Sequence, residues 1–148
     1  HMAMLPSGTV GYELAEDRRA WARQYGWDAR GPEHPAEADV VFVTPGTERA
    51  VATALMIAAP GARVVLFAPL APGLPTPLDL SGLYFRDLRI SFSYSCGPED
   101  TLAAFRAFED KKVRAEQFVS EFIKLDELPG AYERMRAGKT LKPMVLFS

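Results

Sequence analysis

The hydrophobic pattern of the chain alternates between short apolar runs and segments in which apolar residues recur at helical spacing. The apolar runs predict β-strands, because a strand that is covered on both faces has apolar side chains at nearly every position. The helical segments begin with acidic residues and end at a glycine, as helices commonly do. In chain order the predicted elements are a strand at 9–14, a helix from Glu16 to a stop at Gly26, a strand at 40–43, a helix from Glu48 to a stop at Gly61, and a strand at 63–67.

This alternation predicts an α/β fold with a doubly wound parallel sheet, because crossover helices bring successive strands into parallel register. The link at residues 27–38 is rich in proline, glycine and charge and predicts a loop. Ligands of such sheets bind beyond the carboxyl ends of the strands. Candidate site residues are therefore expected directly after the predicted strands.

The second half of the chain follows a different pattern beyond Phe67. Four prolines between residues 69 and 77 exclude a helix, so this segment is expected to be extended. Residues 88–94 alternate apolar and polar side chains, which predicts a strand with one buried face. The remaining predicted elements are a helix opened by Gly97 with Leu102, Phe105 and Phe108 packed on one side, a strand at 118–125, a helix between Asp126 and Gly138, and an apolar run at 144–147.

Composition narrows the class of protein. A length of 148 residues with 48% hydrophobic and 24% charged residues is typical of a globular domain. The net charge is −2 and the basic residues are scattered, so neither nucleic acid nor a membrane surface is an expected partner. No apolar stretch approaches the roughly 20 residues of a membrane span. Cys96 is the only cysteine, which excludes an internal disulfide and favours a cytoplasmic protein.

Most signatures of catalysis are missing from the sequence. Apart from His1, which we interpret as part of a tag remnant, His34 is the only histidine, so neither a serine triad nor a histidine metal site is predicted. Residues 138–140 read Gly-Lys-Thr like the end of a phosphate-binding loop, but Glu133 stands where that motif needs its first glycine. Cys96 has no evident histidine partner and is interpreted as an incidental thiol. We therefore predict no catalytic and no metal-ligating residue.

One acidic residue lies where a nucleotide could bind. Glu13 ends the first predicted strand, and Arg18 follows in the first turns of the next helix. In dinucleotide-binding sheets an acid at this position accepts hydrogen bonds from ribose hydroxyls and repels the extra phosphate of NADP. A carboxylate near a helix N-terminus is an equally good explanation of Glu13 taken alone, because the helix dipole favours it there. Both interpretations stay open at this point.

An ordered series of short stretches extends over residues 9–147. In chain order they are Glu-Leu-Ala-Glu-Asp-Arg-Arg with Gly26 downstream, Ala-Asp-Val-Val-Phe-Val-Thr-Pro-Gly-Thr, Pro-Gly-Ala-Arg-Val-Val-Leu-Phe, Ser-Tyr-Ser, Leu-Asp-Glu-Leu-Pro-Gly-Ala-Tyr, and Arg-Ala-Gly-Lys-Thr-Leu-Lys. Through their order and spacing the chain resembles the carboxyl-terminal part of the zinc-type medium-chain dehydrogenases, the group of alcohol, sorbitol and threonine dehydrogenases. No single stretch is diagnostic.

The resemblance implies a cofactor site built mostly at strand ends. Glu13 would bind the adenosine ribose, and Arg18 would be a second contact on that ribose. Lys142 matches a basic residue that pairs with the pyrophosphate. The other implied contacts are Thr44, Pro45 and Gly46 beside the riboses, Phe67 and Ala68 where the cofactor backbone passes, and Phe92 and Ser93 along the nicotinamide carboxamide. The family usually has glycine where Ala68 stands, so this position departs from its pattern.

Two parts of the family's machinery are missing from the sequence. A glycine-rich fingerprint should precede the ribose-binding acid by about 20 residues, but only twelve residues precede Glu13. In the family the zinc ligands also lie upstream, in a separate catalytic domain. The resemblance thus implies that NAD is bound weakly or not at all by this chain, and that zinc belongs to the parent family only.

The missing first strand is the central one in the strand order 3-2-1-4-5-6 of such sheets. We therefore expect a partial Rossmann-like sheet in which the strands ending at Glu13 and Val43 each have an unpaired edge. Such edges recruit other strands, so a homodimer or a strand-exchanged oligomer is expected. Residues 88–94 match the segment that commonly builds the family's dimer interface.

The expected domain organisation has three parts. They are a tag remnant and leader at 1–8, a partial dinucleotide-binding domain at 9–95, and a C-terminal α+β segment of the dehydrogenase fold at 96–148.

Three functions are consistent with these observations. The first is the C-terminal, nucleotide-binding part of an NAD(P)-dependent zinc-type alcohol or polyol dehydrogenase, an oxidoreductase that is inactive in this form. The second is a naturally truncated, non-catalytic binding or oligomerisation module. The third is an unrelated small α/β protein of flavodoxin-like topology, against which the later part of the chain argues.

Overall fold

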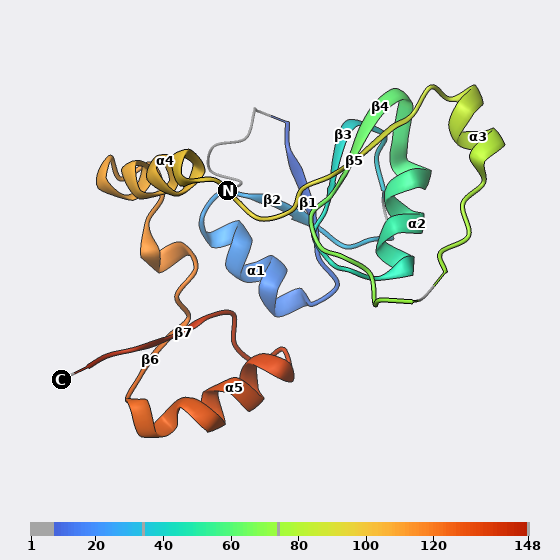
Figure 1. Ribbon diagram of the computed structural model, residues 1–148. Coiled ribbons are helices and arrows are strands. Elements are labelled where there is room, and N and C mark those ends of the chain that lie inside the picture. Colours follow the sequence, from blue (N-terminus) through green and yellow to red (C-terminus); the bar gives the residue numbers. More distant parts are fainter. Residues whose placement is uncertain (1–7, 34, 74, 148) are drawn as a thin grey trace. The chain divides into compact units, whose positions relative to one another are not determined.

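The chain is described by a computed structural model, in which short parallel sheets alternate with helices (Figure 1). The described residues are 8–33, 35–73 and 75–147. Residues 1–7, which make up most of the predicted tag remnant and leader, and His34 lie outside this part of the chain.

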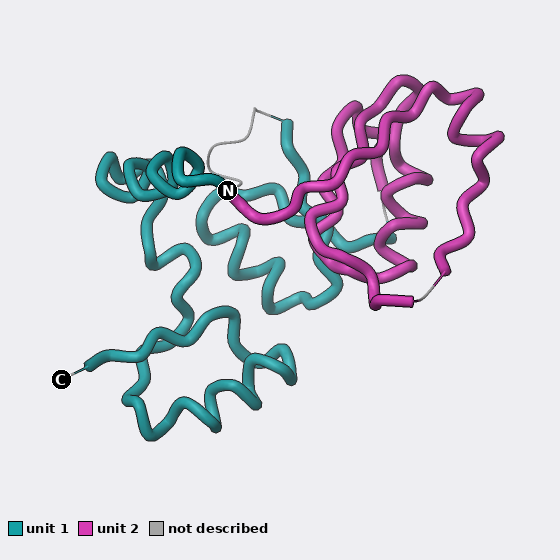
Figure 2. Tube along the Cα trace, viewed as in Figure 1, with its two compact units in different colours: residues 1–34, 97–148 teal, residues 35–96 magenta. Residues whose placement is uncertain are grey.

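The chain divides into two compact units (Figure 2). Unit 1 combines residues 1–34 with residues 97–148, and unit 2 holds residues 35–96. The second division, after Cys96, falls one residue beyond the predicted boundary after Ser95. The assignment of the units to domains stays a prediction.

The first part of unit 1 is a parallel strand pair with a helix between its strands. The elements are β1 (Val10–Tyr12), α1 (Glu16–Gln24) and β2 (Asp28–Arg30). Gly11 lies opposite Ala29 in this pair, and Gly26 follows α1 with a φ of 79°, as the predicted helix stop requires. The loop predicted over 27–38 is wrong where β2 forms, because this short polar strand pairs through its backbone and buries only Ala29.

The second part of unit 1 contains another parallel strand pair. Its elements are α4 (Pro98–Glu109), a 3-10 turn η2 (Ala115–Gln117), β6 (Glu121–Ile123), a 3-10 turn η3 (Leu125–Glu127), α5 (Leu128–Arg136) and β7 (Pro143–Val145). Phe122 of β6 lies opposite Met144 of β7. Gly138 follows α5 with a φ of 72°, as predicted. The predicted order of helices and strands in this segment is confirmed.

Side chains of α1 and the residues after it join the two parts of unit 1. Trp21 donates its indole N–H to the carbonyl of Gln117 at 3.2 Å, and the Tyr25 hydroxyl donates to the carbonyl of Glu116 at 2.6 Å. The ring of Trp27 lies 6.0 Å from that of Phe118. The hydrogen-bonded residues are 96 and 91 positions apart in the chain, so these contacts connect the N-terminal part of unit 1 to its C-terminal part.

Unit 2 is a three-stranded parallel sheet in the order β3-β4-β5. Its elements are β3 (Ala38–Val43), α2 (Glu48–Ile57), β4 (Ala58–Leu66), α3 (Leu80–Phe85) and β5 (Arg89–Phe92). Val64 of β4 lies between Val41 of β3 and Ile90 of β5. The strand–helix–strand alternation predicted from the hydrophobic pattern is confirmed here.

One face of this sheet is covered by α2 (Figure 1). The buried side chains are Val51, Ala54 and Ile57 from α2 and Val41, Val43, Ala58, Ala62 and Val64 from the sheet. Since side chains of a strand alternate between faces, Val40 and Phe42 lie on the opposite face, where they are 52% and 55% exposed. The prediction that β3 is covered on both faces is therefore wrong, because the described part of unit 2 provides a helix for one face only.

Two further features of unit 2 differ from the prediction. α2 passes directly into β4, so Gly61 lies inside the strand and does not end the helix. Its φ of 80° and a hydrogen bond from its N–H to the carbonyl of Arg86 mark a local irregularity. α3 was not predicted, although Asp79 caps it by accepting a hydrogen bond from the N–H of Gly82 at 3.0 Å.

Several apolar side chains that are predicted to be buried are exposed. They are Leu102, Phe105 and Phe108 of α4, and Phe92 and Tyr94 at the end of β5. Only Ala107 of α4 is buried, so the predicted packing of this helix is wrong, because regular spacing gathers side chains on one side without supplying a surface to cover them. None of the described helices is long and apolar enough to cross a lipid bilayer.

Two strands of the described chain have an unpaired edge, as the sequence analysis predicts. Among the described residues, β1 pairs with β2 alone, and β3 pairs with β4 alone. All three sheets are parallel. The predicted fold class is confirmed as a partial, Rossmann-like parallel sheet followed by a C-terminal segment of helices and strands.

Candidate nucleotide-binding site

Glu13 lies directly after β1, at the carboxyl end of that strand. Its Oε1 accepts a hydrogen bond from the N–H of Ala15 at 3.0 Å, and its Oε2 lies 3.7 Å from Nη1 of Arg18. The side chains of Glu13 and Arg18 are 38% and 34% exposed. The carboxylate thus accepts a hydrogen bond from a backbone N–H at the start of α1, as expected of an acid near a helix N-terminus. It still presents acceptor positions to solvent.

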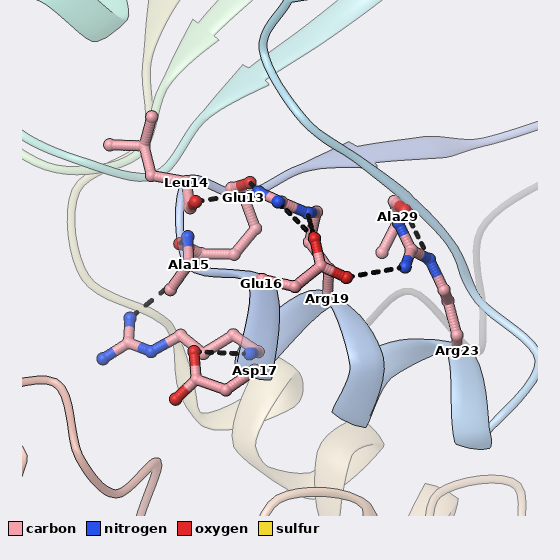
Figure 3. Close-up of polar contacts among 9 residues, drawn as sticks. Glu13, Leu14, Ala15, Glu16, Asp17, Arg19, Arg23 and Ala29 are labelled. Carbon is pink, nitrogen blue, oxygen red and sulfur yellow. Dashed lines mark hydrogen bonds and ion pairs between the residues drawn. The ribbon is translucent and has the colours of Figure 1, made fainter.

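Arg19 fixes the backbone that presents Glu13 (Figure 3). Its Nη1 donates to the carbonyls of Glu13 and of the next residue at 2.6 and 2.8 Å, and its Nε donates to Glu16 at 2.9 Å. Glu16 also accepts from Arg23 at 3.0 Å, and Arg23 donates to the carbonyl of Ala29 at 3.0 Å. Sequence analysis misses Arg19, although an acid and a base three residues apart on a helix are a signal that could have found it.

The arginines of this network hold the pKa of Glu16 below its usual value of 4.5. The hydrogen bond from Arg19 is the main cause, and the positive charges of Arg19 and Arg23 act in the same direction against partial desolvation. In β2, a hydrogen bond of 2.6 Å to Arg30 likewise lowers the pKa of Asp28 and raises that of Arg30. Glu16 and Asp28 are therefore ionised and paired with arginine at neutral pH.

The other predicted contacts of unit 1 are Arg18 and Lys142. Nε of Arg18 is buried without a hydrogen-bond partner among the described residues, and its Nη2 would lie 3.7 Å from a Cβ placed on Gly138. Lys142 is exposed, and its backbone N–H and carbonyl are both hydrogen-bonded to Ser120 at 3.1 Å. The Nε–H of Arg18 is therefore an unsatisfied donor within the described part of the chain, and it is closed to solvent.

In unit 2 the parallel register brings seven predicted residues to one edge of the sheet. The N–H of Phe67 donates to the carbonyl of Val43 at 2.9 Å, and the N–H of Ser93 donates to the carbonyl of Leu66 at 2.9 Å. The carboxyl ends of β3, β4 and β5 consequently lie side by side. The predicted residues at these ends are Thr44, Pro45 and Gly46 after β3, Phe67 and Ala68 after β4, and Phe92 and Ser93 at β5.

Two of the loops at this edge approach each other closely at Gly46. A Cβ on Gly46 would lie 2.0 Å from the carbonyl oxygen of Pro69 and 3.6 Å from Cβ of Ala68. No larger residue fits at this position unless the backbone moves. The structure therefore gives Gly46 a packing role in addition to the cofactor contact that the resemblance implies.

Each unit carries chemical groups of a different kind. Unit 1 offers a carboxylate and an arginine, which suit ribose hydroxyls and phosphate, and unit 2 offers loop backbone and exposed aromatic rings. Among the described residues, no group of three His, Cys, Asp or Glu side chains could hold a metal ion, so zinc has no set of ligands here. The side chains and backbone groups described above can form hydrogen bonds with a nucleotide. The ten cofactor contacts remain predictions.

A shallow groove of about 320 Å³ lies elsewhere in unit 2, between α2 and the segment before α3. Its surface is mainly apolar and includes none of the ten predicted contacts. It is lined by Glu48, Arg49, Val51, Ala52, Leu55, Thr76, Pro77 and Leu78.

Comparison with solved structures identifies the class of fold. No protein-family model matches the sequence, and no curated protein is significantly similar to it. The chain is similar to the alcohol dehydrogenase TADH from Thermus sp. ATN1, with a TM-score of 0.83 and 22% identity over 99% of this chain and 46% of that chain.

Two further structures were solved with a nucleotide cofactor bound. A protein from Sinorhizobium meliloti 1021, provisionally assigned as a zinc-binding dehydrogenase and bound to NADP, gives a TM-score of 0.84 and 21% identity over 95% of this chain and 45% of that chain. A protein from Escherichia coli CFT073 is described as a short-chain alcohol dehydrogenase in complex with NADH. It gives a TM-score of 0.81 and 14% identity over 95% of this chain and 45% of that chain.

By its fold, the chain is a Rossmann-like α/β protein of the kind found in zinc-binding alcohol dehydrogenases. It spans less than half the length of each of these three structures. This agrees with the resemblance to the carboxyl-terminal part of such enzymes.

Proposed function

We propose that the chain is the nucleotide-binding part of an NAD-linked, zinc-type dehydrogenase for an alcohol or polyol, that it works in the cytoplasm, and that it has no catalytic activity by itself. The observation that carries this proposal is the partly exposed carboxylate of Glu13 at the carboxyl end of β1, next to Arg18. Similar structures bound to NADH and NADP support a dinucleotide as the ligand.

Glu13 accepts hydrogen bonds from the two hydroxyls of the adenosine ribose in this proposal. An ionised carboxylate has about four acceptor positions, of which the N–H of Ala15 uses one. Enough acceptors remain for a diol, and the negative charge disfavours the 2′-phosphate of NADP. Arg18 keeps the carboxylate oriented through its Nη1 and offers a second contact to the same ribose.

Within unit 2, the residues at the carboxyl edge of the sheet are the candidate contacts for a dinucleotide. Thr44 and Gly46 lie in the loop after β3, and Phe67 follows β4 with 62% of its surface exposed. Lys142 would pair with the pyrophosphate. When bound, NAD supplies the nicotinamide ring that exchanges a hydride, while the residues of this chain bind and orient it; no step is assigned to zinc.

Calorimetric titration with NAD and with NADP tests the proposal. We expect weak binding that favours NAD, and Glu13→Gln should weaken NAD binding roughly tenfold or more, because hydrogen bonds to a charged group are lost. Glutamine keeps an oxygen for the N–H of Ala15, so circular dichroism should show an unchanged fold. Glu99→Gln, which removes an exposed acid from the first turn of α4, is the matched control. Equal affinity of the wild type and Glu13→Gln would refute the assigned site.

A naturally truncated, non-catalytic module is the second candidate, which the exposed apolar surfaces of α4 and β5 favour. It predicts that neither NAD nor NADP binds while the chain forms a stable dimer. In that case residues 88–94 are the proposed dimer contact. Replacing the exposed Phe92 with serine should then shift the sedimentation coefficient from that of a dimer to that of a monomer.

A further inference from the structure

One peptide group in the turn after β1 is held at both of its ends. The peptide between Leu14 and Ala15 presents its carbonyl oxygen to Nη1 of Arg19 at 2.8 Å. Its N–H donates to Oε1 of Glu13 at 3.0 Å (Figure 3). Because a trans peptide group is planar, its C=O and N–H bonds point in opposite directions. A contact that fixes the carbonyl therefore also fixes the N–H, and this N–H holds one oxygen of the Glu13 carboxylate.

Arg19 holds this turn at two successive carbonyls. Besides the oxygen of Leu14, Nη1 donates to the carbonyl of Glu13 at 2.6 Å. The two acceptors belong to the peptide groups on either side of the Leu14 Cα atom. Both peptide groups are thus held by one nitrogen, which fixes the backbone dihedral angles between them.

The guanidinium of Arg19 is itself held from its other side. Its Nε donates to Oε2 of Glu16 at 2.9 Å, and its Nη2 donates to the same oxygen. The other oxygen of Glu16 accepts from Arg23 at 3.0 Å, and Nε of Arg23 donates to the carbonyl of Ala29 in β2 at 3.0 Å. The network therefore connects β2 to the turn that carries Glu13.

These contacts leave Arg19 little capacity to bind a ligand directly. They use four of the five N–H donors of a guanidinium, and the side chain is only 13% exposed. The side chain of Glu13 is 38% exposed. Any effect of Arg19 on a bound nucleotide is therefore expected to act through the position of Glu13.

We propose that Arg19 is a positioning residue of the nucleotide site, which orients the carboxylate of Glu13 through the peptide between Leu14 and Ala15. The inference rests on the proposed function, in which Glu13 accepts hydrogen bonds from both hydroxyls of the adenosine ribose. A carboxylate that accepts from two hydroxyls at fixed spacing must be held in one orientation. Contacts that hold it before the ligand arrives reduce the entropy lost on binding.

A lysine at position 19 would keep the positive charge and lose this geometry. An ammonium group donates from a single nitrogen, whereas a guanidinium donates in a rigid planar fork. Arg19→Lys therefore separates the effect of the fork from the effect of the charge. Arg106→Lys, at an exposed arginine in the last turn of α4, is the matched control.

Nucleotide titration followed by NMR measures the effect on binding. Arg19→Lys should raise the dissociation constant for NAD roughly three- to tenfold, the equivalent of one weakened hydrogen bond. The dissociation constant for NADP should change less, because Glu13 repels its 2′-phosphate in the proposed function. Arg106→Lys should leave both constants unchanged, and circular dichroism checks that both variants are folded.

A double-mutant cycle with Glu13→Ala separates positioning from a general structural role. Glu13→Ala removes the carboxylate that Arg19 is proposed to orient. Adding Arg19→Lys to Glu13→Ala should therefore cause no further loss of NAD affinity. If Arg19 only supported the fold, it would weaken NAD binding equally in both backgrounds.

Amide exchange at Ala15 tests the positioning without any nucleotide. Arg19→Lys should accelerate exchange of this N–H roughly threefold or more, because its hydrogen bond to Glu13 opens more often. Arg106→Lys should leave the rate unchanged.

Three results would overturn the inference: unchanged NAD affinity in Arg19→Lys, an equal loss of affinity in the wild-type and Glu13→Ala backgrounds, or unchanged exchange at Ala15. A wild type that binds neither NAD nor NADP refutes the proposed function instead. Exchange at Ala15 then decides alone whether Arg19 orients Glu13, so the two failures can be told apart.

Discussion

At the scale of single residues, the turn after β1 is held by charge pairs that no hydrophobic pattern reveals. Arg19 donates to two successive carbonyls and to Glu16, so one guanidinium fixes both the turn and the start of α1. Its side chain is only 13% exposed. The backbone position of Glu13 therefore depends on a neighbour six residues further along the chain.

The acid sensitivity of this turn follows from the lowered pKa of Glu16. A carboxylate whose pKa is lower in the folded chain than in the unfolded chain stabilises the fold above its usual value of 4.5, and this contribution is lost as pH falls through the folded pKa. Glu16→Gln should therefore lower the free energy of unfolding at pH 7, and the difference from the wild type should shrink below about pH 4.5.

Urea unfolding at a series of pH values between 3 and 8 measures this difference. Glu99→Gln, which also removes one negative charge, serves as the control. A gap between wild type and Glu16→Gln that stays constant from pH 7 down to pH 3 would show that the Arg19 and Arg23 pairs do not act through the charge of Glu16.

The sequence predicts the position of Glu13 but not its surroundings. The end of an apolar run places this acid at the carboxyl end of β1, and the structure agrees. The contacts of Arg19 with backbone carbonyls depend on how the turn folds back on α1. A pattern of residue types carries no information on that geometry.

At the scale of elements, α2 shows how local signals fix a helix. Thr47 accepts a hydrogen bond from the N–H of Ala50 at 3.2 Å and caps the helix, while Val51, Ala54 and Ile57 recur at helical spacing and are buried. Cap and apolar face agree, and the helix begins at Glu48 as predicted, but its predicted end at Gly61 is wrong because α2 passes into β4 after Ile57.

The cap gives a prediction for α2. Thr47→Ala should lower the free energy of unfolding by about 1 kcal/mol, because the N–H of Ala50 loses its acceptor. Thr47→Ser keeps the hydroxyl and should stay within a few tenths of a kcal/mol of the wild type. Urea unfolding followed by circular dichroism compares the three proteins. Equal losses in both variants would mean that the methyl group of Thr47 matters and the cap does not.

Elements without a strong apolar pattern are not predicted from the sequence. β2 consists of Asp28, Ala29 and Arg30, and its only buried side chain is a methyl group. It exists because its backbone pairs with β1, a long-range contact that local composition does not show. For α3 a local signal was present, since Asp79 stands three residues before Gly82 and caps the helix.

At the scale of the whole molecule, the described chain buries few large side chains. The largest fully buried ones are Val64 and Val113, whereas Phe85 and Tyr94 are 85% and 95% exposed. Large apolar surfaces commonly mark sites of contact with other chains or domains. The order of elements could be predicted from the sequence, but burial could not, because spacing shows which side chains share a face and not what packs against it.

A substitution at Gly46 tests whether the two units unfold separately. Gly46→Ala would place a Cβ 2.0 Å from the carbonyl oxygen of Pro69, so unit 2 should lose about 1–3 kcal/mol of stability through overpacking. Both tryptophans, Trp21 and Trp27, belong to unit 1. If the units unfold separately, amide exchange in β3 and β4 should accelerate by roughly 5- to 150-fold, while the urea midpoint from tryptophan fluorescence stays where it is.

Gly130→Ala is the matched control in unit 1. A Cβ there would meet only Nη1 of Arg134, at an ordinary distance of 3.5 Å, within α5. This substitution should raise the stability of unit 1 by about 0.5–1 kcal/mol, because alanine loses less backbone entropy than glycine in a helix. It should leave exchange in β3 unchanged. If Gly46→Ala instead moved the fluorescence midpoint as far as it accelerated exchange, the chain would unfold as one cooperative body, and the two units would be a division of contacts only.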